Sequence, residues 1–465
     1  MSKRNVVLIE SFLTEYDETI NSELNIDPLG LLIIWSALGQ QVFRSRVSSI
    51  SNDVRNYTLN LFNHWLVHQL MEDDSFVMGK VLTRRYQNKQ GQNFKNACLL
   101  YLENTFAYSM VKHEAQPNIN SRGVLGISKA RNQWNLQNEN PILRFGHERK
   151  AHLLENQLSL GVSGRYKTPL VEMGFFDRNY NYNEPEAIAL WNEVHQLIIG
   201  NPDLKKLADD LKIHLRNLLK QDGEISHSFD DLPPLLTEAF TNAFSSPAMV
   251  GNYARDFWLS VSELDQGASG ALYRTLLQSD KLGSLNPART ADLFGQAFLE
   301  ELSPLEQLKL EHIRLVEPLL AELDLLFSLM LSSTRQSLSE IENLWKSLGR
   351  NTTTLAGFAK PIAGYEAMRS VLSSTANERL SSLLEVAIAP SVKDQIRALL
   401  AYHETVMERR GQSPWLILRE KSELKLHVRP RGVPNSNKRP VGSWHNEYYI
   451  PQFRNLIVGL QGFAS

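Results

Sequence analysis

The chain has 465 residues, a formal net charge of −2, and 42% apolar and 22% charged residues. This is the ordinary composition of a globular protein with several domains, and it excludes disordered and low-complexity scaffolds. The single cysteine, Cys98, excludes disulfide-stapled scaffolds and multi-cysteine zinc modules and favours a reducing cytoplasm. No signal peptide is expected, and no apolar run reaches the length of a transmembrane helix, so we expect a cytoplasmic protein without a membrane partner.

The hydrophobic pattern is helical almost throughout, with apolar residues recurring three and four positions apart. Pro28 lies in the first turn of the first expected helix, and Asn52 is the expected N-cap of the second. Further helices are predicted over residues 94–111, 184–199, 203–219, 233–244, 247–264, 304–330, 337–348, 376–387 and 392–410. The predicted fold class is therefore mainly α, a multi-helix globular body.

Two stretches depart from the helical pattern. Residues 116–144 are rich in Asn, Gln, Gly and Arg, which predicts a long loop. Residues 415–419 and 424–428 alternate apolar and polar side chains around a charged turn, the pattern of a β-hairpin. The helix that begins at residue 392, this small C-terminal β-hairpin and the basic loop after it are together similar to a winged helix.

Composition divides the chain into four expected segments. The first is a helical N-terminal domain over residues 1–115, and the second is a basic and loop-rich segment over 116–183. An acidic helical domain over 184–388 and a basic helix-hairpin module over 389–465 follow.

Charge is strongly segregated along the chain. Residues 409–439 contain nine basic and two acidic residues, residues 122–167 contain eight and three, and residues 222–324 contain seventeen acidic and six basic residues. Clustered Arg and Lys side chains supply most sequence-independent affinity for nucleic acid, whereas a solvated surface or docking onto the acidic middle of the chain is the simpler alternative. The expected contacts to a DNA or RNA backbone come from Arg409, Arg410, Arg419, Lys421, Lys425, Arg429, Arg431, Lys438 and Arg439, and from Arg144, Arg149, Lys150, Arg165 and Lys167.

The motifs of common enzyme classes are missing. The sequence contains no P-loop, no dinucleotide-binding glycine pattern, no HExxH zinc motif and no GxSxG elbow, and we expect no cofactor and no metal site. Two short patterns have nuclease counterparts. Arg397 and His403 have the RxxxxxH spacing of HEPN ribonucleases, and Glu423 with Lys425 has the ExK form of magnesium-dependent nucleases, although no upstream acid is evident.

A glutamate and a histidine form a third candidate pair. Glu404 lies near the end of an expected helix, and His445 lies in an aromatic stretch. Such a pair can act as a general acid and base, or it can brace the C-terminal segment. The sequence from His403 through Pro414-Trp415 and the basic hairpin to Leu460 resembles the EH-signature proteins of bacterial anti-phage defence loci, among them the ZorC components of Zorya systems. The resemblance implies that Glu404 and His445 are the signature residues.

The resemblance also implies a DNA-associated accessory subunit that works beside an ATPase, helicase or nuclease. Together with the basic clusters, it predicts a non-enzymatic nucleic-acid-binding subunit, of DNA in the first place, in a bacterial defence assembly. A metal-dependent or HEPN-like nuclease and a helical protein adaptor remain as alternatives. Metal dependence separates a nuclease from a binder, and salt dependence separates a binder from an adaptor.

Overall fold

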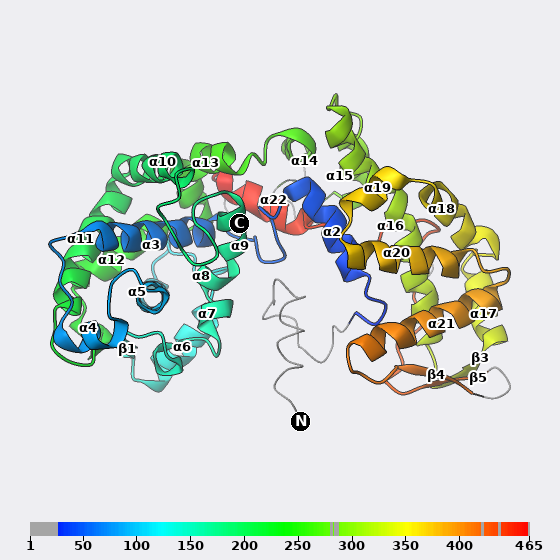
Figure 1. The fold of residues 1–465 in the computed structure, drawn as a ribbon, viewed down its shortest axis with the longest axis horizontal. Helices are drawn as coiled ribbons and strands as arrows, with labels where there is room; N and C mark the ends of the chain where they lie inside the picture. Colours follow the sequence, from blue (N-terminus) through cyan, green and yellow to red (C-terminus); the bar gives the residue numbers. More distant parts are fainter. Residues whose placement is uncertain (1–26, 280–281, 283–287, 420–422, 436–438, 464–465) are drawn as a thin grey trace. The chain divides into compact units, whose positions relative to one another are not determined.

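The computed structural model describes residues 27–279, 282, 288–419, 423–435 and 439–463. The described chain is mainly helical with small antiparallel sheets, which confirms the predicted fold class (Figure 1). No helix in these ranges is both long and apolar enough to cross a membrane.

The chain forms two compact units, each built from distant parts of the sequence. Unit 1 contains the described parts of residues 1–43, 265–281 and 286–450, and unit 2 contains those of residues 44–264, 282–285 and 451–465. These units differ from the four expected segments over 1–115, 116–183, 184–388 and 389–465, because composition changes along the chain do not reveal which helices pack together.

Unit 2 is built around two long buried helices, Val54–Glu72 and Gln92–His113. Its elements are α3 (Val54–Glu72), α4 (Lys80–Tyr86), α5 (Gln92–His113), α6 (Ile127–Leu136), β1 (Ile142–Arg144), η1 (Arg149–Ala151), α7 (Gln157–Leu160), α8 (Val162–Arg165), α9 (Lys167–Glu172), α10 (Ala187–Gly200), α11 (Pro202–Leu219), β2 (Ser226–Ser228), η2 (Phe229–Asp231), α12 (Pro234–Phe244) and α13 (Pro247–Ser262). Strands β1 and β2 pair in antiparallel fashion.

Helix α3 is buried on nearly every side, so its polar residues need partners within the protein. The Arg55 guanidinium pairs with Asp53, and the Thr58 hydroxyl accepts a hydrogen bond from Trp258 Nε1. Asp53, and not the expected Asn52, is the N-cap, because its side chain accepts from the backbone N–H of Arg55.

Unit 1 combines helices with a three-stranded sheet. Its elements are α2 (Leu32–Phe43), α14 (Gly267–Gln278), α15 (Thr290–Ala297), α16 (Pro304–Met330), β3 (Arg335–Ser337), α17 (Leu338–Ser347), α18 (Thr353–Ala363), α19 (Glu366–Val371), α20 (Ser374–Ala387), α21 (Val392–Arg409), β4 (Leu416–Arg419) and β5 (Glu423–Leu426). Helix α22 (Ile450–Leu460) follows and lies almost entirely in unit 2. Helix α16 is the central helix, and α2, α17, α18 and α21 pack against it.

The expected hairpin is present and gains a third strand. Strands β4 and β5 are antiparallel, and β3 pairs with β5 to give the order β3-β5-β4. In the chain, β3 directly precedes α17, and β4 is the next element after α21. Three further helices, α18 to α20, separate α17 from α21.

Residues 116–144 are not one long loop as expected. They contain α6 and the start of the β1-β2 sheet. Helix α6 is polar on its exposed side and buries only Ile127 and Ala130 within its length, so its apolar signal in the sequence is weak.

Candidate functional site

The segment of residues 439–448, here called the strap, lies along helix α16. Three acidic residues of α16, Glu317, Glu322 and Asp324, contact it. They lie within about two turns of the helix, and the strap carries His445, one of the two expected signature residues. This arrangement makes α16 and the strap the first candidate site.

Glu317 is fully buried and accepts four hydrogen bonds. Its Oε1 accepts from the backbone N–H groups of His445 at 2.5 Å and Asn446 at 2.8 Å, and its Oε2 accepts from Trp35 Nε1 and the Tyr448 hydroxyl, both at 2.7 Å. Burial raises the pKa of Glu317, and the four donors oppose that rise. The carboxyl group thus holds the strap through its backbone.

Glu322 and Arg350 form a buried ion pair beside the same strap. Arg350 binds both carboxylate oxygens, at 2.9 and 2.8 Å, and also donates to the backbone carbonyl of Arg439. Glu322 in turn accepts from the backbone N–H of Gly442. Gly442 has φ +72°, and a Cβ there would lie 2.9 Å from the Phe358 ring, so this turn requires glycine.

The His445 ring lies at the solvent-facing side of this arrangement and is 43% exposed. Its Nδ1 is 3.3 Å from Arg439 Nη1, and its Nε2 is 3.6 Å from Asp324 Oδ2. Because a guanidinium only donates, Nδ1 is the acceptor and Nε2 carries the proton. Asp324 is thus the carboxylate next to the His445 ring. Trp35 packs against the same ring at 5.8 Å between centroids.

Glu404 does not join His445. It lies half-exposed on α21, and within the described ranges no hydrogen bond or ion pair connects the two residues. The expected pair fails because His445 is held by α16, through Asp324 and the Glu317 contact to its backbone. Sequence reasoning missed both acids because acidic residues on a long helix usually indicate a solvated face.

The two residues of the HEPN-like pattern, Arg397 and His403, lie in different environments. His403 is fully buried, its Nδ1 bonds to the carbonyl of Pro28, and its Nε2 accepts from the backbone N–H of Trp415. Burial lowers the pKa of His403. Arg397 is exposed and pairs with Asp394. Both ring nitrogens of His403 are occupied within the fold, so this histidine fixes the start of the hairpin and has no nitrogen left for a substrate.

The second candidate site is the solvent-facing side of the three-stranded sheet, here called the outer face. The register places Lys425 between Arg335 and Ile417, and it places Glu423 between Ser337 and Arg419. Side chains alternate along a strand, so these six residues share one face while Leu416, Leu424 and Leu426 are buried on the other. Trp415 and His427 continue the outer face, since His427 N–H donates to the Trp415 carbonyl.

The cations on and beside the outer face reach solvent. Arg335, Arg419, Arg429 and Arg431 are exposed, and Lys425 is half-exposed. Among the residues that the structure describes, none of the five forms an ion pair. Arg335, which the sequence analysis did not include, joins the cluster only through strand pairing, and its sequence neighbours gave no signal for this.

The remaining C-terminal cations have protein partners. Arg409 pairs with Glu378, Arg410 with Asp27, and Arg439 with Asp324 and the carbonyl of Ala321. Lys421 and Lys438, two of the expected contacts, lie outside the described residues.

Most of the expected basic cluster of unit 2 is either paired with acids or wholly or partly buried. Arg149 pairs with Glu155, and Lys150 pairs with Glu224. Arg165 is buried, and Lys167 lies over the Tyr180 ring at 4.4 Å, where burial lowers its pKa. Of the five expected residues, Arg144 alone is exposed without an ion pair in the described ranges.

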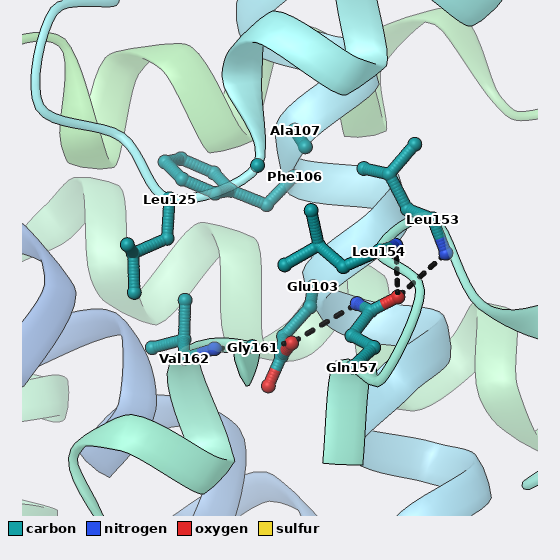
Figure 2. Close-up of a pocket in the computed structure, with 10 residues that line it drawn as sticks. Glu103, Phe106, Ala107, Leu125, Leu153, Leu154, Gln157, Gly161 and Val162 are labelled. Atoms are coloured by element: carbon teal, nitrogen blue, oxygen red, sulfur yellow. Dashed lines mark hydrogen bonds between the residues drawn. The ribbon is translucent and has the colours of Figure 1, made fainter. Parts of the chain in front are cut away.

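A small cavity in unit 2 is lined by Glu103, Phe106, Leu125, Leu154, Gln157 and Val162 (Figure 2). Glu103 is buried and accepts from the backbone N–H of Ser163 at 2.7 Å and from Gln157 Nε2 at 3.1 Å, and burial raises its pKa. Gln157 in turn accepts from the backbone N–H groups of Leu153 and Leu154. These polar groups satisfy one another, so they hold the loop around α7 and α8 in place.

Glu423 and Lys425, the ExK pattern, both lie on the outer face. Within the described ranges, no three His, Cys, Asp or Glu residues gather in a group that could hold a metal ion. The pattern therefore gains no support from its neighbours. Comparisons with protein-family models, curated proteins and solved structures return no match to this chain.

Proposed function

We propose that this protein binds the backbone of nucleic acid through the outer face of its three-stranded sheet. The observation that carries the proposal is the cross-strand pair of Arg335 and Lys425, two like charges directly opposite each other. Like charges in this position destabilise a sheet. Among the described residues, the one acid of the outer face is Glu423, which stands opposite Arg419 and Ser337.

Clustered cations that form no ion pair in the described part of the chain are suited to phosphate groups. Four arginines and a lysine on and beside one small sheet can contact successive phosphates, whereas cations already paired with acids would first have to break those pairs. In the setting that the resemblance to EH-signature proteins suggests, the protein would be a DNA-associated accessory subunit, with a partner ATPase, helicase or nuclease supplying the chemistry.

The double variant Arg335→Ala with Lys425→Ala tests the proposal. Affinity for a labelled oligonucleotide should fall, and the dependence of log K on log salt should become shallower by about 1.4 to 1.8, since two phosphate contacts are lost. The free energy of unfolding should stay constant or rise, because a repulsive pair is removed. Fluorescence anisotropy at several salt concentrations measures the first effect, and chemical denaturation measures the second.

The matched control is Arg149→Ala with Lys150→Ala in unit 2. It removes the same amount of positive charge, but from two cations that already pair with acids. Its affinity should equal that of the unchanged protein. Equal losses in the two double variants would show that only net charge matters, and unchanged affinity in the first would refute the outer face as the binding surface.

A further inference from the structure

Trp415 lies at one end of the outer face, next to the unpaired cations. Trp415 directly precedes β4. Its carbonyl accepts a hydrogen bond from His427 N–H, so the hydrogen bonding between the two strands β4 and β5 continues to Trp415. The indole is half-buried, and His403 contacts it from the buried side at 6.3 Å between ring centroids. The ring is thus held in place from within while part of it stays accessible.

The guanidinium of Arg431 covers this ring, with its Cζ 5.3 Å from the ring centroid. Arg431 is exposed, and its backbone N–H donates to the Leu331 carbonyl, so only its side chain is free to turn. A cation–π contact at an exposed position is weaker than the stacking of a nucleobase on an aromatic ring. A base can therefore replace the guanidinium, which then becomes available to a phosphate.

We propose that the outer face selects single-stranded nucleic acid over duplex, with an unpaired base stacked on Trp415 and the strand's phosphates on Arg335, Arg419, Lys425, Arg429 and Arg431. This inference rests on the function proposed above and names the substrate class of the same site. An aromatic platform beside a row of cations is the combination that binds single strands without sequence preference. In a duplex the bases are stacked on each other and leave only phosphates for the sheet.

Helix α21, next to the sheet, gives no counterpart for duplex reading. Its cations Lys393, Arg397 and Arg409 are each paired with an acid, and its accessible side also carries Glu404 and Glu408. A helix inserted into the major groove would bring these acids close to the phosphates. The outer face, and not α21, is therefore the surface that suits the ligand.

The experiment compares three probes of equal length: an oligothymidylate strand, the same sugar-phosphate strand with abasic positions throughout, and a duplex. The abasic strand keeps every phosphate and lacks bases. The oligothymidylate should bind at least about fivefold more tightly than the abasic strand, the least that one stacked base contributes. Equal affinity for these two strands, with salt dependence retained, overturns the stacking inference while the proposed function stands. Absence of binding to all three probes overturns both.

Variants of Trp415 provide the second arm. Trp415→Leu should lower affinity for the oligothymidylate to that for the abasic strand, and Trp415→Phe should retain part of the difference. The control is Trp134→Leu, because Trp134 is half-buried in unit 2 against Phe229, at 5.3 Å between centroids. A Trp415→Leu protein that is folded by circular dichroism and still prefers the oligothymidylate would overturn the proposal, as would an equal loss in the Trp134 variant.

Discussion

Tyr101 connects two histidines of unit 2 through a single hydroxyl group. Its oxygen is 2.7 Å from His214 Nε2 and 2.8 Å from His227 Nε2, and His227 Nδ1 is 2.9 Å from the carbonyl of Ser228. A carbonyl only accepts, so His227 Nδ1 carries the proton and its Nε2 accepts from the Tyr101 hydroxyl. The hydroxyl oxygen is then free to accept from the Nε2–H of His214. His214 thus donates to Tyr101, Tyr101 donates to His227, and His227 donates to the Ser228 carbonyl.

Acid should weaken this part of the fold. Burial, with a smaller contribution from His227, lowers the pKa of His214 from 6.5 to about 4. The folded state then binds fewer protons than the unfolded chain, so the stability from this group is present above pH 6.5 and is lost as the pH falls towards 4. The variant His214→Gln keeps an N–H donor for Tyr101 without a titrating ring, and it should lose less stability between pH 7 and 4 than the unchanged protein.

Chemical denaturation across that range measures the effect. His427→Gln serves as the control, because His427 is exposed on the outer face. Identical pH dependence in the His214 variant and the unchanged protein would contradict the assignment of the acid sensitivity to this residue.

The strap shows how two elements are joined by one buried carboxyl group. Glu317 of α16 binds the backbone of the strap on one oxygen and two side chains on the other. In Glu317→Gln, an amide nitrogen replaces one of the two carboxylate oxygens and faces the donors that this oxygen bound. Because the amide nitrogen cannot accept a hydrogen bond, those donors lose their partner. We expect the free energy of unfolding to fall by about 1 to 3 kcal/mol, the cost of leaving buried polar groups unsatisfied.

His445→Ala is the informative control for this prediction. The exposed ring is removed, but the backbone N–H that binds Glu317 remains. Stability should change by less than about 0.5 kcal/mol, as is usual for surface side chains. If His445→Ala were the more destabilising of the two changes in a denaturant titration, the strap would depend on the ring and not on its backbone.

Long helices were the elements that the sequence predicted well. Residues 304–330 match α16, and the predicted hairpin matches β4 and β5 to within two residues at each end, because their periodicity and turn residues are strong local signals. Strand β3 was missed because Arg335–Ser337 has only three residues and is a strand only through pairing with β5. The same non-local pairing explains why Arg335 could not be identified as part of the candidate site.

At the scale of the whole molecule, ion pairing decides which positive charges are available. Fourteen basic residues were expected to contact nucleic acid, but many of them bind Asp or Glu side chains or are buried. With a net charge of only −2 and almost equal numbers of basic and acidic residues, local pairing hides most basic clusters from a ligand. The outer face is the exception because strand pairing sets Arg335 directly opposite Lys425, and neither forms an ion pair among the described residues.

This difference can be measured as a salt dependence. Each phosphate contact on a single strand contributes about −0.7 to the slope of log K against log salt. The five cations on and beside the outer face that form no ion pair within the described ranges therefore give a slope of about −3.5, whereas all fourteen candidates would give about −10. We expect a value near the smaller magnitude for oligothymidylate, and Arg429→Ala should reduce it by about 0.7 without changing thermal stability. A slope near −10 would mean that the paired cations open to bind phosphate, and a slope near zero would mean that phosphate is not the ligand of this surface.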